Sequence, residues 1–121
     1  MKLKTFPDEL TVCKLAKTAD FDAEMDFCFL ARTDEEVSLV CRTSDVPAHT
    51  AAREDGWRGF RIEGQLDFSL IGILAKLSAI LAENRIGIFA VSTYNTDYIL
   101  VKADDFARAM AALAAAGYEI E

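Results

Sequence analysis

The stretch that most restricts the fold is residues 60–102, where the spacing of apolar side chains changes three times with little intervening chain. Apolar residues first recur three and four positions apart, which places one apolar stripe along a helix: Leu70, Ile73, Leu74, Leu77, Ile80 and Leu81. Short apolar runs of strand length follow at residues 86–91 and 98–101. The stretch therefore predicts strand, helix, strand, hairpin and strand, with the helix lying against a sheet.

The flanking residues complete this pattern into a β-α-β-β-α-β unit. A strand is expected at residues 57–63, an Ala-rich helix at 104–116 and a last short strand at 118–121. Asp67 or Ser69 can accept amide hydrogens at the start of the first helix, and Asn84 and Gly117 are expected to end the two helices in the left-handed conformation. The fold class is α+β: a ferredoxin-like sandwich in which two helices cover one face of a four-stranded antiparallel sheet.

The first half of the chain is predicted to be rich in strand and poor in helix. A short edge strand is expected at residues 3–6, and longer strands at 9–17, 27–32 and 36–42. Residues 18–25 have room only for a loop or a single turn. Residues 43–56 lack clear periodicity and read as the connector between halves, with room for a short helix at 48–54.

A short internal similarity relates the two halves. Residues 33–40 align with residues 94–101, because each segment has a polar turn, an acidic residue and then a strand containing Leu-Val. The alternative is that these are two ordinary hairpins. The repeat interpretation divides the chain into a degenerate unit at residues 1–56 and a complete unit at residues 57–121.

Charge and composition exclude several classes of partner. The net charge of -7 disfavours nucleic acid, which is bound largely through Lys and Arg. No apolar run approaches the roughly 18 to 20 residues that span a bilayer, and no secretory signal is evident, so we expect a cytoplasmic protein that does not bind membranes. Cys13, Cys28 and Cys41 lie in separate apolar runs and are interpreted as reduced core residues, and the lone His49 offers too few ligands for a metal.

Three segments carry a family resemblance: Glu-Gly-Gln-Leu-Asp-Phe-Ser-Leu-Ile-Gly-Ile-Leu-Ala at 63–75, Ile-Gly-Ile at 86–88, and Ser-Thr-Tyr-Asn-Thr-Asp-Tyr-Ile-Leu-Val at 92–101. They resemble the ACT domain, a small-molecule-binding regulatory module, and particularly the small tandem-ACT proteins similar to the CASTOR arginine sensors. Two features depart from the family. The usual Asp-x-Pro-Gly turn is replaced by Ser-Leu-Ile-Gly at 69–72, and an Asn that often holds an effector is replaced by Gly87.

The resemblance directs attention to the start of the first helix. A free amino acid needs amide hydrogens for its carboxylate and acceptors for its ammonium, and this helix start offers amides while Asp67 and Asp97 offer acceptors. The same residues also have purely structural readings, as helix caps and as a turn-stabilising aspartate, which stay open. The expected ligand site consists of Asp67, Ser69, Leu70, Ile71, Gly72, Thr93 and Asp97.

These observations predict a non-catalytic regulatory or sensor domain that binds a free amino acid without a cofactor, and the resemblance implies a homodimer. The alternative is a protein interaction module without a small ligand. An enzyme is disfavoured because the sequence lacks a histidine beside any cysteine, a phosphate-binding glycine loop and a metal-ligand cluster. Because Lys76 and Arg85 lie further along or beyond the helix, the nearby carboxylates favour a neutral or basic ligand side chain over Asp or Glu.

Overall fold

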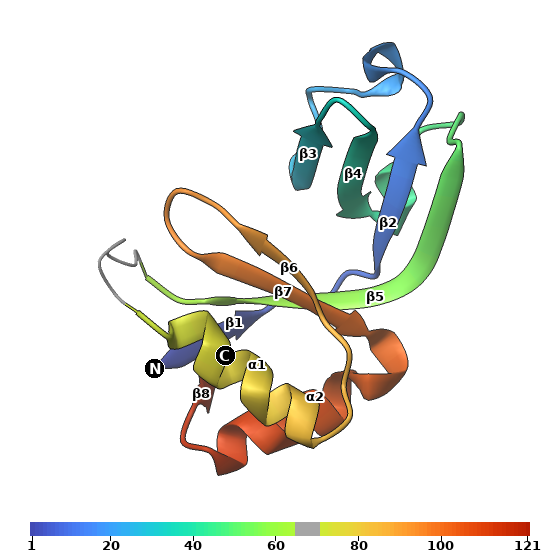
Figure 1. Ribbon diagram of the computed structural model, residues 1–121. Helices are drawn as coiled ribbons and strands as arrows, with labels where there is room; N and C mark the ends of the chain where they lie inside the picture. The colour runs from blue at the N-terminus through green and yellow to red at the C-terminus, as the bar shows by residue number, and fades with distance from the viewer. Residues whose placement is uncertain (65–70) are drawn as a thin grey trace. The chain divides into compact units, whose positions relative to one another are not determined.

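The structure of the chain, a computed structural model, describes residues 1–64 and 71–121 (Figure 1). The chain forms two compact units, which are described separately. Unit 1 comprises Met1–Pro7 and Arg58–Glu121, and unit 2 comprises Asp8–Trp57. The long strand β5 (Ala52–Ile62) contributes residues to both units.

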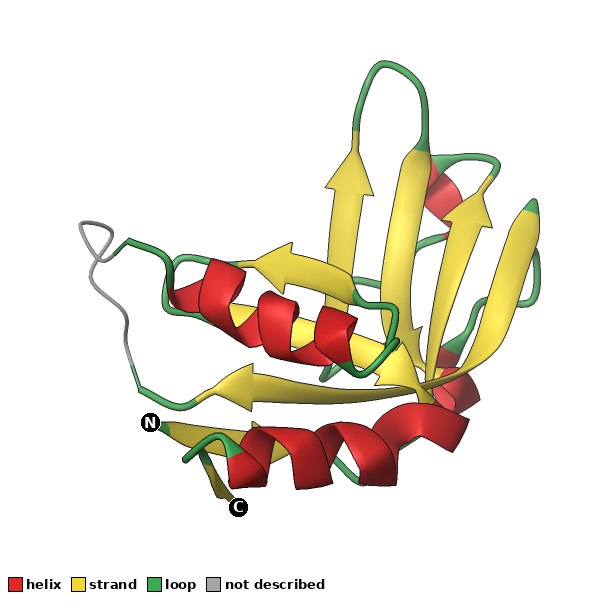
Figure 2. Cartoon of the chain, turned by 60° about the horizontal axis from the view of Figure 1, so that its bottom comes forward, coloured by secondary structure: helices red, strands yellow, loops and turns green. Residues whose placement is uncertain are grey.

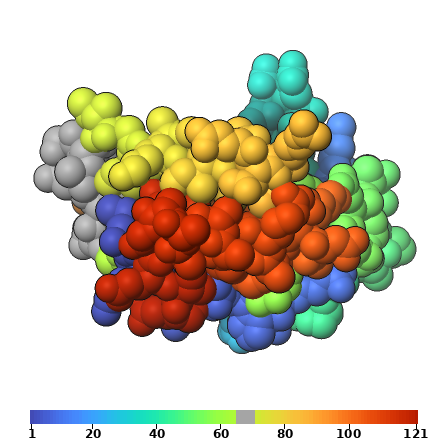
Figure 3. All heavy atoms as spheres, turned by 90° about the horizontal axis from the view of Figure 1, so that it is seen from below, coloured from blue at the N-terminus to red at the C-terminus, as the bar shows by residue number. Residues whose placement is uncertain are grey.

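Unit 1 contains the predicted β-α-β-β-α-β sequence of elements. The end of β5 is followed by α1 (Ile73–Glu83), β6 (Phe89–Ser92), β7 (Asp97–Lys102), a 3₁₀ turn (Ala103–Asp105), α2 (Phe106–Ala115) and β8 (Glu119–Ile120). The two helices lie side by side on one face of the sheet (Figures 2 and 3). This arrangement confirms the predicted α+β fold class.

The core of unit 1 lies between these helices and the sheet. Leu77 and Leu81 of α1 and Leu113 of α2 are fully buried, as the spacing of apolar residues predicts. They pack in one cluster with Leu3, Phe60, Ile62, Ile86, Ile99, Val101 and Ala109. On α2, Ala109 is buried beside Leu113, whereas Ala114 is exposed.

The first strand of the chain occupies an unexpected place in unit 1. Strand β1 (Lys2–Thr5) was expected at an edge, but it lies between β5 and β8, so that the strand order is β6-β7-β5-β1-β8. It pairs antiparallel with β5 and parallel with β8. The sheet is therefore mixed rather than purely antiparallel, because a strand from the other end of the chain is inserted between the first and last strands of the unit.

The helix ends confirm one predicted cap and correct another. Gly117 has φ 102° and ends α2 as predicted; its amide donates to Ala114 O and that of Tyr118 donates to Leu113 O. At the end of α1, Asn84 has φ -94° and is not left-handed. The left-handed residue is Arg85, with φ 59°, followed by an Ile86 amide that donates to Leu81 O. Asn84 instead donates its side-chain Nδ2 to Ile80 O at 2.9 Å.

This correction predicts that Arg85→Gly stabilises the protein. Glycine adopts the left-handed conformation without the steric cost of a Cβ atom, so the free energy of unfolding should rise by about 1 kcal/mol. Urea denaturation measures the change. Asn84→Gly is the matched comparison and should be destabilising, because it removes the bond to Ile80 O and gains nothing at φ -94°. If Asn84→Gly were the more stable of the two variants, the left-handed residue would be Asn84 and not Arg85.

Unit 2 has four antiparallel strands and no α-helix. Its elements are β2 (Leu10–Leu15), a 3₁₀ turn (Thr18–Asp20), β3 (Cys28–Arg32), β4 (Val37–Arg42), a second 3₁₀ turn (Thr43–Asp45) and the first part of β5. The strand order is β3-β4-β2-β5. If the strands of unit 2 are numbered by their position along the chain, the order across the sheet is 2-3-1-4. Strands β5 to β8 of unit 1 have the same order, 2-3-1-4, when the inserted strand β1 is left out.

The hairpins of the two units correspond with an offset of 60 residues, from Val37 to Asp97, rather than the 61 of the sequence alignment. In each, the amide of a threonine, Thr33 or Thr93, donates over 2.9 Å to the carbonyl three residues later. Strands β4 and β7 then have the same length and the same pattern of burial, and each leads into a 3₁₀ turn. Alignment on the repeated Leu-Val pair misplaced the register by one residue, which would move every side chain to the opposite face of the strand.

The prediction of a short helix at residues 48–54 is wrong. Residues 52–57 instead form the start of β5 and pair with β2. Side chains support this pairing. Thr11 is fully buried and donates from Oγ1 to Asp55 Oδ1 at 2.7 Å, and Arg53 Nη2 donates to the same oxygen at 2.9 Å. These two donors lower the pKa of Asp55, with Thr11 the larger cause. A polar segment thus becomes a strand through contacts that lie far away in the sequence.

Candidate functional site

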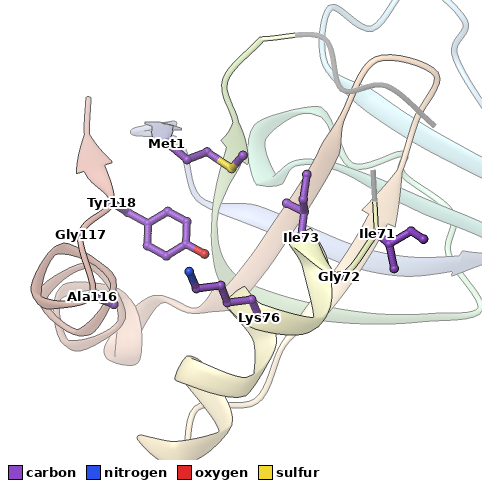
Figure 4. Close-up of a pocket in the computed structure, with 8 residues that line it drawn as sticks. All are labelled: Met1, Ile71, Gly72, Ile73, Lys76, Ala116, Gly117 and Tyr118. Carbon is purple, nitrogen blue, oxygen red and sulfur yellow. The ribbon is translucent and has the colours of Figure 1, made fainter. Parts of the chain in front are cut away.

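A cavity of about 290 Å³ opens in unit 1 where α1 begins and α2 ends (Figure 4). Antiparallel neighbours in this fold bring the start of one helix beside the end of the other, and the two helices are in contact. Its lining comes from the start of α1, the α2–β8 connection and the first residue of the chain: Met1, Ile71, Gly72, Ile73, Lys76, Ala116, Gly117 and Tyr118.

Gly72 shapes the helix end of the cavity. It is the residue before α1 and has φ 84° and ψ 3°, a left-handed conformation that favours glycine. The amide of Lys76 donates to Gly72 O at 2.9 Å. Within the described part of the chain, no side chain caps this end. The first amides of α1 therefore present hydrogen-bond donors and the positive end of the helix dipole.

Two polar side chains, one from α1 and one from the α2–β8 connection, point into the cavity. Figure 4 shows the Lys76 ammonium and the Tyr118 hydroxyl directed toward the same space. Lys76 lies four residues after Gly72, on the same face of α1, and helical side chains lean toward the start of their helix. Burial raises the pKa of Tyr118, so its phenol stays protonated at neutral pH and is available as a donor.

The electrostatic character of the cavity is positive. Lys76 is the one charged side chain among the described lining residues, none of which is acidic. No described carboxylate forms an ion pair with its ammonium. The remaining walls are apolar or backbone, so the cavity presents a cation, a phenol and helix amides against apolar surface.

The connection after α2 holds Tyr118 in place. The left-handed Gly117 and the bond from the Tyr118 amide to Leu113 O, 3.1 Å long, turn the chain sharply after the helix. The amide of Glu119 then donates to Met1 O at 3.0 Å, which fixes the strand that follows beside β1. The tyrosine is thus positioned by backbone bonds on both sides.

The structure places the predicted ligand residues in two groups. Ile71 and Gly72 line the cavity, and Ile71 is 95% exposed. Thr93 and Asp97 belong to the β6–β7 hairpin and are not among the lining residues. Asp67, Ser69 and Leu70 lie outside the described residues.

The polar atoms of the β6–β7 hairpin bond mainly within the hairpin. Ser92 Oγ donates to Asp97 Oδ1 at 2.6 Å, and Thr93 Oγ1 donates to Thr96 O at 3.0 Å. Thr96 is buried and donates from Oγ1 to Ile62 O at 2.7 Å, joining the turn to β5. These bonds give Asp97 and Thr93 a structural role in the turn, as one of the sequence readings expected.

Sequence reasoning missed Lys76 and Tyr118. It placed Lys76 too far along the helix to serve the site, whereas the structure includes its side chain in the lining of the cavity. The spacing of Gly72 and Lys76, one helical turn, was a usable signal. Tyr118 carried a weaker signal, the neighbouring helix-ending Gly117, and needed the antiparallel placement of the two helices.

The cysteines of unit 2 have the buried setting that the sequence predicted. Cys13 and Cys41 are buried, Cys28 is half-buried, and all three are free thiols. Burial raises the pKa of Cys41 to about 12, with the neighbouring Cys13 a lesser cause, so this thiol is a poor nucleophile at neutral pH. Among the residues that the structure describes, no group of three or more His, Cys, Asp or Glu side chains is arranged to hold a metal.

Several solved structures are similar in fold to this chain. Protein Atu0741 from Agobacterium tumefaciens is 32% identical, with a TM-score of 0.86 over 99% of this chain and 91% of that chain. The regulatory subunit of aspartate kinase from Thermus thermophilus is 10% identical, with a TM-score of 0.63 over 95% of this chain and 96% of that chain. Aspartate kinase from Clostridium acetobutylicum is 15% identical, with a TM-score of 0.63 over 91% of this chain and 32% of that chain.

The two aspartate kinase structures share the fold, whereas Atu0741 also shares about a third of its residues with this chain. No curated protein matches the chain. Neither helix of the described residues has the length and apolar character needed to cross a bilayer. The sequence model of the ACT domain matches residues 52–115, more than half of the chain. The chain belongs to the ACT domain family.

Proposed function

We propose that the chain is a non-catalytic regulatory unit that binds a free amino acid or a similar zwitterion at the start of α1. The observation that carries the proposal is the cavity there, which combines apolar walls with helix amides that have no side-chain cap among the described residues. Its volume of about 290 Å³ is at the small end of ligand pockets, which suits a metabolite of amino-acid size. The fold similarity to a regulatory subunit of aspartate kinase agrees with such a role.

In this proposal the ligand carboxylate receives hydrogen bonds from the amides that follow Gly72. The ammonium lies near Asp67 or Asp97, and Ser69, Leu70, Ile71 and Thr93 complete the surroundings. The proposal follows the resemblance to CASTOR-type sensors in the kind of ligand, and it places the protein in the cytoplasm. It also keeps the division into a degenerate ACT-like unit at residues 1–56 and a complete one at residues 57–121.

A thermal-shift panel of all twenty amino acids tests the proposal. A ligand present at 100 times its dissociation constant should stabilise the protein by about 2.7 kcal/mol. Calorimetry then measures the affinity of each ligand that shifts the melting temperature. If none of the twenty shifts the melt at millimolar concentration, binding of amino acids is ruled out at useful affinity, and the interaction-module alternative replaces it.

A pair of matched variants tests the part played by Asp97. Asp97→Ala should abolish binding, because it removes a carboxylate that accepts hydrogen bonds from the ligand ammonium. Little secondary structure should be lost, because Asp97 is only half-buried. Asp34→Ala is the control, because Asp34 is an exposed acidic residue in the corresponding hairpin of unit 2. Equal affinities in the two variants would remove Asp97 from the site.

We also propose that the protein forms a homodimer. Strands β6 and β8 end the sheet of unit 1 and leave backbone groups available for pairing. Sedimentation at micromolar concentration should give twice the chain mass of 13.3 kDa. A species with the mass of one chain would contradict the dimer without affecting the ligand proposal.

A further inference from the structure

The Lys76 side of the cavity has hydrogen-bond donors that the side chain of a neutral, apolar amino acid would not use. The ammonium of Lys76 and the hydroxyl of Tyr118 form no ion pair or side-chain hydrogen bond with another described residue, and both face the cavity. The side chains of Met1, Ile71, Ile73 and Ala116, which also line the cavity, carry neither a hydrogen-bonding group nor a charge. The pair is therefore suited to a ligand group that accepts hydrogen bonds and carries negative charge.

We propose that the ligand is an acidic amino acid, whose side-chain carboxylate binds Lys76 and Tyr118; this inference rests on the proposed function. The α-carboxylate lies at the amides after Gly72, and the second carboxylate lies beside the ammonium of Lys76. These two places are separated along α1 by one helical turn, about 5.4 Å, a spacing that a short side chain spans. The sequence-based preference for a neutral or basic ligand is thereby reversed.

Charge explains why an acidic ligand is favoured. A hydrogen bond between ionised partners is roughly twice as strong as one between neutral groups. The net charge of -7 acts against an anion only over longer distances, because physiological salt screens exposed charges beyond about 8 Å. The local cation therefore determines the preference within the cavity.

Isosteric pairs of ligands test this inference directly. Aspartate and asparagine, and glutamate and glutamine, differ in side-chain charge with almost the same shape. Calorimetry with the full chain should show at least one acid binding about tenfold more tightly than its amide. In Lys76→Met, which keeps an unbranched stem but removes the charge, this ratio should fall to near one while the affinity for the amide is unchanged.

Two further variants separate charge in the cavity from other effects. Lys4→Met is the control, because Lys4 is exposed and does not line the cavity, and its acid-to-amide ratio should match that of the original protein. Tyr118→Phe removes only the hydroxyl and should reduce the ratio several-fold. Melting curves establish that each variant is folded before its affinity is compared.

The outcomes distinguish this inference from the proposed function. Preference for an acid that disappears in Lys76→Met supports it. If amino acids bind but no acid exceeds its amide, or if the preference survives in Lys76→Met, the inference is overturned and the proposed function stands. If none of the four ligands binds but another amino acid does, the acidic class is wrong. If no amino acid binds, both proposals fail together.

Discussion

Replacing Leu77 with aspartate is expected to unfold unit 1. Leu77 has no exposed surface and packs in the α1–α2 core cluster with Leu81 and Leu113. An unpaired carboxylate at this position loses its hydration without gaining a partner, which costs several kcal/mol against a total stability of about 5–15 kcal/mol. Circular dichroism during heating should show the cooperative transition of the original protein greatly lowered in temperature or lost.

Ala79→Asp is the control for Leu77→Asp. Ala79 is exposed on the same helix, so an aspartate there changes helix propensity and charge without entering the core. It should lower the free energy of unfolding by less than about 1 kcal/mol. A melting temperature for Leu77→Asp equal to that of Ala79→Asp would place Leu77 outside the core and contradict the packing of α1.

Leu3→Ala is expected to have the second largest effect. Leu3 has no exposed surface and lies in β1 between its register partners Ile62 of β5 and Ile120 of β8. Truncation leaves a cavity in the unit 1 core, so the free energy of unfolding should fall by about 2–5 kcal/mol. Equilibrium denaturation in urea measures the loss.

Lys4→Ala provides the comparison within the same strand. Lys4 is exposed, and its truncation should change stability by only about 0.5 kcal/mol. A loss below about 1 kcal/mol for Leu3→Ala would indicate a peripheral strand, as the sequence analysis expected. The measurement therefore decides between an edge strand and one inserted in the sheet.

The parts of the fold that sequence predicted well are those with a local cause. Residues three and four apart on α1 and α2 define their buried faces, and Gly117 ends α2 because a left-handed residue is required there. The β6–β7 hairpin likewise follows from a polar turn between two apolar runs. In each case the determining residues lie within a few positions of one another.

The parts that sequence missed depend on residues that are distant along the chain. The central place of β1 results from pairing with β5 and β8, and the start of β5 is held in the strand by Thr11 of β2. Arg85 has no sequence feature that favours a left-handed backbone, and Asn84 beside it has one, so the cap was assigned one residue early.

In the candidate site, too, residues with a local signal could be predicted from the sequence, and a residue that is distant along the chain could not. Gly72 could be identified because a glycine before a predicted helix offers a close approach to its first amides. Tyr118 follows Gly72 by more than forty residues and reaches the cavity only because α2 ends beside the start of α1 (Figure 4). Lys76 was within reach of local reasoning, since it lies one turn from Gly72 on the same helix face.

The most direct test of the account is where a bound amino acid contacts the chain. Titration of the isotope-labelled protein with the amino acid that gives the largest thermal shift, followed by nuclear magnetic resonance of the backbone amides, locates the site. The account predicts saturable shifts of the amides of Gly72, Ile73, Lys76 and Tyr118, with those of Leu15 and Leu39 in the unit 2 core unchanged. Saturable shifts confined to other residues, with these four amides unmoved, would contradict it.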